Sequence, residues 1–119
     1  MQVEKIAWNS QAEKKLESAL MGDSIQIKYE VENRIAELWL IDKVSYLVTR
    51  VEHSADNKRE LVLVAGAGKN AAAAIEYFKN KAKENSINSI RLHSNLKGIK
   101  RLIEKTGLKP IETVYRAVF

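Results

Sequence analysis

The stretch LVLVAGAGKNAAAAIEYF, residues 61–78, joins an apolar run, a two-glycine turn with a lysine and an alanine-rich segment. The apolar run from Leu61 to Val64 predicts a strand buried on both faces, and therefore a central one. Apolar residues after the glycines recur at helical spacing and predict a helix over residues 70–85. A strand that turns at glycines into a helix N-terminus can hold an anion, because free N–H groups and the helix dipole point at one spot.

The first part of the chain predicts a short strand and a helix. Residues 2–8 fit a strand, and the helix begins at Asn9 or Ser10. Ser10 and Glu13 stand at capping-box spacing, and Gly22 is the expected stop.

The middle of the chain predicts antiparallel strands. Residues 23–33 fit no single pattern, whereas residues 35–41 and 44–52 alternate as strands joined by a tight turn. Residues 54–58 have the composition of a second turn. A meander of three strands is expected, ending in the apolar run.

The last part of the chain predicts a strand at 89–94, a helix from 95 that Gly107 ends, and a final strand at 111–119. The order β, α, β, β, β, α, β, α, β combines hairpins with a β-α-β crossover. It predicts an α/β (α+β) fold with a mixed, twisted central sheet and helices on both faces. At this length, residues 1–119 are expected to form one domain. Within its sheet, the strand that ends at Ala65 is expected to separate from the strand at 89–94.

Composition narrows the class of protein. The chain has no cysteine, which excludes a disulfide framework and a thiolate nucleophile. No apolar run is long enough to cross a membrane, and no signal peptide is apparent, so a cytoplasmic location is expected. Residues 1–57 carry 7 Lys/Arg against 10 Asp/Glu, net −3, whereas residues 58–119 carry 13 against 5, net +8. The basic half predicts an anionic partner, either a phosphate-bearing small molecule or nucleic acid, or it is simply a solvated helical surface.

Two phosphate-binding motifs fail at the glycine turn. A Walker A loop needs a glycine where Leu63 stands and a Ser or Thr where Asn70 stands. Gly66, Gly68 and Ala71 match the dinucleotide fingerprint, but the next strand does not end in the required acidic residue. The hairpins also leave no room for a doubly wound sheet.

The whole order of elements resembles the GNAT (Gcn5-related N-acetyltransferase) superfamily. The segment RLIEKTGLKPIETVYR, residues 101–116, is similar to the family's C-terminal pattern of a helix running into a last strand. Small phage-encoded GNAT-like proteins look similar too. The resemblance implies acetyl-CoA as cofactor, with no metal, and N-acetyl transfer as the activity.

The resemblance also implies which residues bind the cofactor. In the family, backbone amides at the strand-to-helix turn cradle the coenzyme A pyrophosphate. Carried over, these are the amides of Gly66, Ala67, Gly68, Lys69 and Asn70. Asn95 lies within one position of an asparagine that often contacts the pantetheine arm. The competing roles are an N-cap for Asn95 and, for the glycines, a sharp turn with close helix–sheet packing.

Catalytic residues are implied less directly. Amine acetylation needs a base, commonly a glutamate on or near the fourth strand, and Glu60 is the best-placed carboxylate. The tyrosine that frequently serves as general acid is replaced by Ile103, and Tyr115 in the last strand is the candidate substitute. The competing roles are a solvated turn residue for Glu60 and packing on the sheet for Tyr115.

Three functions follow as hypotheses. The first is an acetyl-CoA-dependent N-acetyltransferase. The second is a catalytically inactive relative that binds protein, as a phage accessory or virion component in the host cytoplasm or the virion, and possible partners then include a second copy of the chain. The third is a basic nucleic-acid-binding module.

Overall fold

The computed structural model describes residues 1–20 and 22–92. The elements follow one another as β1 (Val3–Ile6), α1 (Ser10–Leu20), α2 (Ser24–Glu32), β2 (Ala36–Ile41), β3 (Ser45–His53), β4 (Arg59–Ala67), α3 (Ala71–Glu84) and β5 (Ser89–Leu92). Within the described residues the strands form one sheet in the order β1-β2-β3-β4-β5. Neighbours are antiparallel from β1 to β4, and β4 pairs with β5 in parallel. The predicted mixed sheet of an α+β protein is confirmed.

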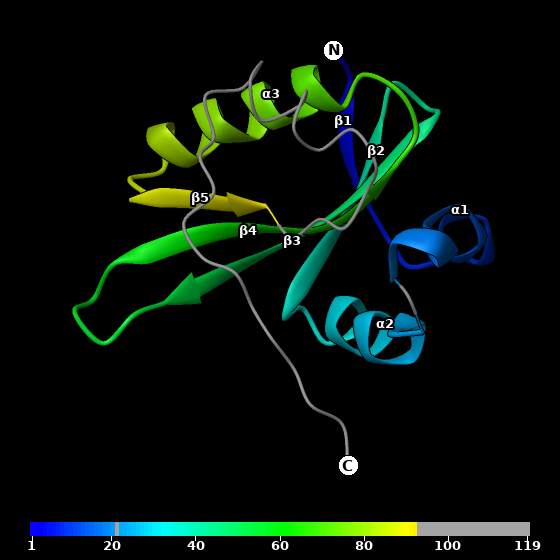
Figure 1. Ribbon diagram of the computed structural model, residues 1–119, viewed down its shortest axis with the longest axis horizontal. Coiled ribbons are helices and arrows are strands. Elements are labelled where there is room, and N and C mark those ends of the chain that lie inside the picture. The colour runs from blue at the N-terminus through cyan, green and yellow to red at the C-terminus, as the bar shows by residue number, and fades with distance from the viewer. Residues whose placement is uncertain (21, 93–119) are drawn as a thin grey trace.

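Helices cover both faces of the twisted sheet (Figure 1). On one face, α1 and α2 bury a cluster that includes Leu16, Leu38 and Val48. On the other face, α3 buries a second cluster around Leu63 and Phe78. The two clusters lie back to back across the sheet, and alternate residues of β2 and β3, such as Leu38 and Trp39, face different clusters.

Three of the four residues in the apolar run of β4 are buried, as predicted, and Val64 is half-buried. Leu61, Val62 and Leu63 expose 7%, 0% and 0% of their surface. Leu61 and Leu63 pack toward α3. Full burial of such a side chain contributes roughly 1.5–3 kcal/mol, so this run anchors the centre of the sheet.

Two N-terminal predictions needed revision. The side chain of Asn9 accepts a hydrogen bond from the backbone N–H of Ala12 at 2.9 Å, so Asn9 caps α1 and Ser10 is its first helical residue. The capping box expected from Ser10 and Glu13 is thus displaced by a cap one residue earlier. The ambiguous residues 23–33 form α2, which buries Ile27 against the sheet.

The C-terminal predictions lie mostly outside the described residues. The strand expected at 89–94 is seen as β5, Ser89–Leu92. The helix expected at 95–107, with Ile103, and the last strand are not among the residues that the structure describes.

Candidate functional site

A β-bulge divides β4 into two halves. Val48 pairs with Ala65 and Thr49 pairs with Leu63, which leaves Val64 without a partner on β3. Val64 and Ala65 therefore both face the cluster under α1 and α2, whereas Leu63 faces α3. A bulge bends its strand and re-aims the backbone that follows, and bulges are over-represented beside active sites.

Beyond the bulge, β4 continues without β5. The parallel pairs run from Glu60–Ser89 to Leu63–Leu92, while β4 itself extends to Ala67. Among the described residues, the edge of β4 from 64 to 67 has no neighbour on the β5 side. This edge leads directly into the glycine turn. Gly66 and Ala67, expected to belong to the turn, are the last residues of β4 and pair with Leu47 and Tyr46.

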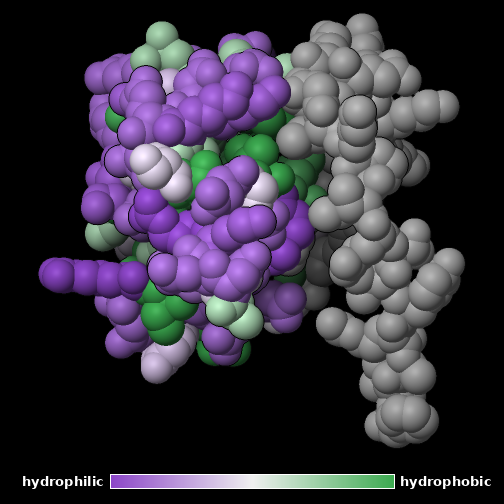
Figure 2. Space-filling view, turned by 90° about the vertical axis from the view of Figure 1, so that its left-hand side faces the viewer, coloured by the Kyte–Doolittle hydropathy of each residue, from purple (hydrophilic) through white to green (hydrophobic). Residues whose placement is uncertain are grey.

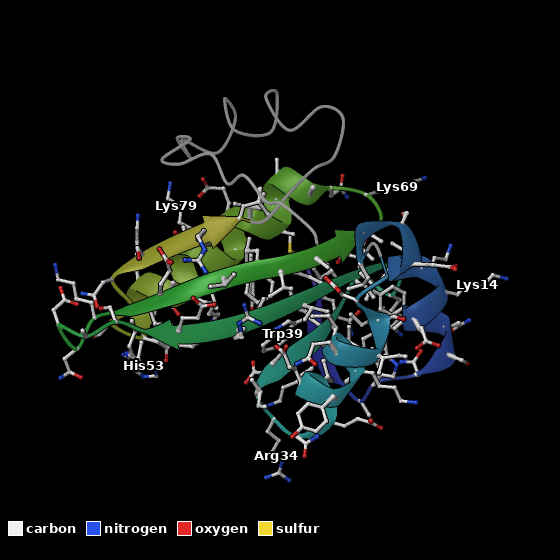
Figure 3. All side chains as sticks on the ribbon, turned by 60° about the horizontal axis from the view of Figure 1, so that its bottom comes forward. Lys14, Arg34, Trp39, His53, Lys69 and Lys79 are labelled. Atoms are coloured by element: carbon white, nitrogen blue, oxygen red, sulfur yellow. The ribbon has the colours of Figure 1, made fainter. Side chains whose placement is uncertain are left out.

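The turn itself is held by a contact with the β2–β3 hairpin. Gly68 has φ +126°, and a Cβ there would lie 2.6 Å from the Cβ of Ser45 and 2.8 Å from its Cα. The Lys69 N–H donates to Ser45 Oγ at 3.0 Å, and that hydroxyl donates to the Lys69 carbonyl at 3.2 Å. Gly68 thus packs closely against the start of β3, a contact other than the helix–sheet packing that was the alternative role of the glycines. The backbone N–H of Lys69 is thus already bonded to Ser45 and is not available to an anion. The side chain of Lys69, which extends outward from the turn, remains available (Figure 3).

The N-terminus of α3 presents free backbone donors. Asn70 adopts a left-handed conformation, φ 60°, and makes no side-chain capping hydrogen bond. The first helical hydrogen bond runs from the Ala74 N–H to the Asn70 carbonyl, 3.1 Å. The amides of residues 71–73 thus have no acceptor within the helix. The first turn contains no acidic residue.

These donors were not among the sequence-predicted site residues. Ala71 and Ala73 are exposed and carry only methyl groups, so an anion can approach their N–H groups closely. The run of small residues at the helix start was the available signal. The contact of Ser45 with the turn had no signal, since the two lie 24 residues apart in the chain.

Glu60 lies at the opposite end of β4 from the turn. Its Oε1 accepts from Arg91 Nη1 and its Oε2 from Ser89 Oγ, both at 2.8 Å. It also lines a polar hollow of about 620 Å³ together with Glu52 and Asn88. Figure 3 shows Lys69 and His53, at the end of β3, on opposite ends of the sheet. The structure thus brings the residues of the turn together with α3 but not with Glu60.

An ion-pair chain surrounds Glu60. Arg91 Nη2 lies 2.8 Å from the Glu52 carboxylate. Arg50 links Glu52 to α2, because its guanidinium lies 2.9 Å from Glu52 and 2.8 Å from Glu30. The hydrogen bond from Arg91, followed by that from Arg50, holds the pKa of Glu52 below its ordinary value against the opposing effect of burial. Charged groups on this face therefore satisfy one another across α2, β3, β4 and β5.

Tyr115 and Asn95 lie outside the described residues. Residues 1–20 and 22–92 contain no group of three or more His, Cys, Asp or Glu side chains placed to hold a metal ion. None of the helices in the described part combines the length and apolar content that crossing a bilayer would require.

Comparison with known proteins places the fold. No family model matches the chain, and no curated protein matches it. Among solved structures, a ribosomal-protein-alanine N-acetyltransferase from Brucella melitensis biovar Abortus 2308 aligns with TM-score 0.72 and 17% identity over 100% of both chains. A predicted acetyltransferase with acetyl-CoA from Clostridium acetobutylicum aligns with TM-score 0.66 and 12% identity over 98% of this chain and 96% of its own.

A third similar structure is an aminoglycoside 6'-N-acetyltransferase from Acinetobacter haemolyticus, with TM-score 0.55 and 13% identity over 100% of this chain and 97% of its own. Together with the mixed sheet, these likenesses show that the chain has the α+β fold of the solved acetyltransferase structures. The resemblance of element order to the GNAT superfamily is therefore confirmed at the level of the fold.

Proposed function

We propose that this protein is an acetyl-CoA-dependent N-acetyltransferase that holds the cofactor's pyrophosphate at the N-terminus of α3. The observation that carries the proposal is the uncapped first turn of α3, with the free amides of residues 71–73 and no carboxylate. This turn follows the part of β4 that has no neighbour on the β5 side among the described residues. Free N–H groups and the helix dipole attract an anion there.

The residues of the turn fit such a group. Gly68 is exposed and has no side chain to obstruct a ligand, and Lys69 is exposed with no ion pair to any described residue. The proposed cradle consists of the amides of Gly66, Ala67, Gly68 and Asn70, the Lys69 ammonium and the amides of residues 71–73. Asn95 completes the proposed cofactor contacts.

The chemistry requires a proton acceptor. Bound acetyl-CoA would supply an acetyl thioester, whose carbonyl carbon an uncharged amine attacks. Glu60 is the proposed base that takes the proton from the acceptor's ammonium, and the hollow beside it gives an acceptor or a water molecule room. Because Arg91 and Ser89 occupy its oxygens, the proton reaches Glu60 through water or after one contact opens. The C–S bond of the thioester breaks as the amide forms, and Tyr115 is the proposed donor of a proton to the departing coenzyme A thiolate.

The cofactor site is tested by a charge placed at its centre. Ala73→Glu puts a carboxylate in the first turn of α3, where the dipole favours it by about 0.3–1 kcal/mol. We expect the variant to be as stable as the wild type or more so, yet to bind coenzyme A at least about tenfold more weakly, about 1.4 kcal/mol. Calorimetric titration with acetyl-CoA and thermal unfolding measure both quantities.

Ala73→Gln is the matched control, since it has the same shape without the charge and is expected to retain binding. Equal affinities in the wild type and Ala73→Glu would show that the helix N-terminus does not contact the phosphates. Absence of binding in the wild type up to millimolar ligand would favour the alternative of an inactive relative that acts by binding protein.

The catalytic role of Glu60 is tested separately. Glu60→Gln removes the base but keeps the shape of the side chain, and a rate loss of roughly 100-fold or more is expected in an acetylation assay with a panel of amines. Glu52→Gln is the control, because Glu52 also pairs with Arg91. A comparable rate loss in both variants would mean that the ion-pair chain is structural and that the base lies elsewhere.

A further inference from the structure

A second hollow lies on the α3 face of the sheet, beside the C-terminal half of α3. It has a volume of about 650 Å³ and extends over β2, β3 and β4. Its floor includes Ile35, Val51 and Leu61, and its rim includes Arg34, Arg59 and Lys81. We call it the β2–β3 groove.

The floor of the groove exposes branched apolar side chains. Ile35 and Val51 expose 50% and 41% of their surface, whereas Leu61 beneath is buried. Ala36 pairs with Arg50, so Ile35 lies beside Val51 where the ladder ends. The adjacent Trp39 is less available, because its Nε1 donates to Thr49 Oγ1 at 2.8 Å and its ring meets Phe78 edge-on. The exposed part of the floor is therefore aliphatic.

The rim of the groove is cationic. Arg34 makes no ion pair with any described residue, and Arg59 donates to the Asn85 carbonyl, 2.6 Å, with no carboxylate partner among the described residues. Lys81 pairs with Glu84 at 3.3 Å. Glu37 is the acidic member of the lining, and its carboxylate lies 4.0 Å from Lys5. Two guanidinium groups thus remain without a carboxylate, the group they bind best.

The groove is separate from the candidate cofactor site. Leu61 and Ala67, the last residue of β4 before the glycine turn, are six residues apart, which is about 20 Å at about 3.3 Å per residue. Figure 2, which faces the end of the molecule with the β3–β4 hairpin, shows green apolar surface set between purple bands of hydrophilic residues. An occupant of the groove therefore does not compete with a ligand at the N-terminus of α3.

We propose that the β2–β3 groove binds a polypeptide segment of a partner protein, in which carboxylates flank a branched aliphatic side chain. The aliphatic residue packs on Ile35 and Val51, and the carboxylates pair with Arg34 and Arg59. A nucleic acid also offers anions, but its bases need open aromatic faces. Tyr77 already meets the ring of Phe78 edge-on and lies under the Lys81 ammonium, 5.7 Å from the ring centre.

The test uses the full chain labelled with ¹⁵N and the synthetic peptide acetyl-Glu-Glu-Leu-Glu-Glu-amide. Titration at low salt should shift the amide signals of Ile35, Val51 and Arg59. Arg34→Glu and Val51→Glu should each weaken binding at least tenfold. Lys14→Glu, on α1 and far from the groove in Figure 3, should leave the affinity unchanged.

Four results would overturn the proposal. The groove signals stay unmoved up to millimolar peptide, or Lys14→Glu weakens binding as much as Arg34→Glu. A peptide with Ser in place of Leu binds equally well, which removes the role of the floor, or an oligothymidine binds the groove more tightly than the peptide. Shifts of the groove signals with protein concentration alone would instead identify a second copy of the chain as the occupant.

Discussion

At the scale of the residue, the glycine turn depends on one close approach. Gly68 sits against the backbone of Ser45, and the Ser45 hydroxyl closes the contact through two hydrogen bonds to Lys69. Ser45 is itself buried, with 5% of its surface exposed. The glycine is therefore required by packing as well as by its positive φ, whatever ligand the turn holds.

The glycines of the chain allow this requirement to be measured. Gly68→Ala adds a collision with Ser45 to an unfavourable φ, and a loss of roughly 2–4 kcal/mol in the free energy of unfolding is expected. Gly22→Ala meets no atom within 4 Å and has φ +91°, so only the backbone term of about 1–2 kcal/mol applies. Gly66→Ala approaches the flexible Leu47 side chain at 3.2 Å and should cost least. Urea unfolding of the three variants checks the order, and equal losses at Gly68 and Gly22 would contradict the role of Ser45.

At the scale of the element, the ion-pair chain ties α2 to three strands. Arg50 of β3 reaches Glu30, which exposes only 7% of its surface on α2, and Glu52 connects the same arginine to Arg91 of β5. The hydrophobic pattern of α2 is weak, since Ile25 and Tyr29 expose 84% and 55% of their surface. A few buried residues and this ion pair therefore hold α2 against the sheet. Because so few apolar residues are needed, residues 23–33 show no clear helical periodicity.

The ion-pair chain should make the free energy of unfolding depend on pH. Because the pKa of Glu52 is lowered in the folded state, chiefly by Arg91, its contribution is fully present above the unfolded pKa, near 4.3–4.5, and is lost as pH falls through the folded value. The wild type should be more stable than Glu52→Gln at pH 7, and the difference should shrink as the pH falls below about 4.5. Thermal unfolding across pH 3 to 7 measures it. A difference that is constant over this range would assign the effect to packing.

At the scale of the whole molecule, the order of the elements in the described residues was predictable except for α2, whereas the joints between the elements were not. Apolar periodicity identified β4, α3 and the hairpin of β2 and β3, because burial imposes a period on each element. The bulge at Val64 was missed, since an inserted residue leaves the composition of an apolar run unchanged. Free N–H groups after the glycine turn were expected, but only the structure shows that Asn70 makes no side-chain cap there and that Ser45 engages the amide of Lys69.

The sequence by itself determined the alternation of strands and helices from β2 to β5, the interior position of the strand that contains Leu61–Val64 and the place where β4 turns into α3, because these depend on local spacing and on glycine. Only the tertiary structure decided which donors stay free at the turn, how the charges around Glu60 are paired, and that Ile35 and Val51 share an exposed floor with two arginines on its rim. These features join residues from different elements. The physical reason is that such contacts arise from packing across the sheet, which leaves no periodic trace in the chain.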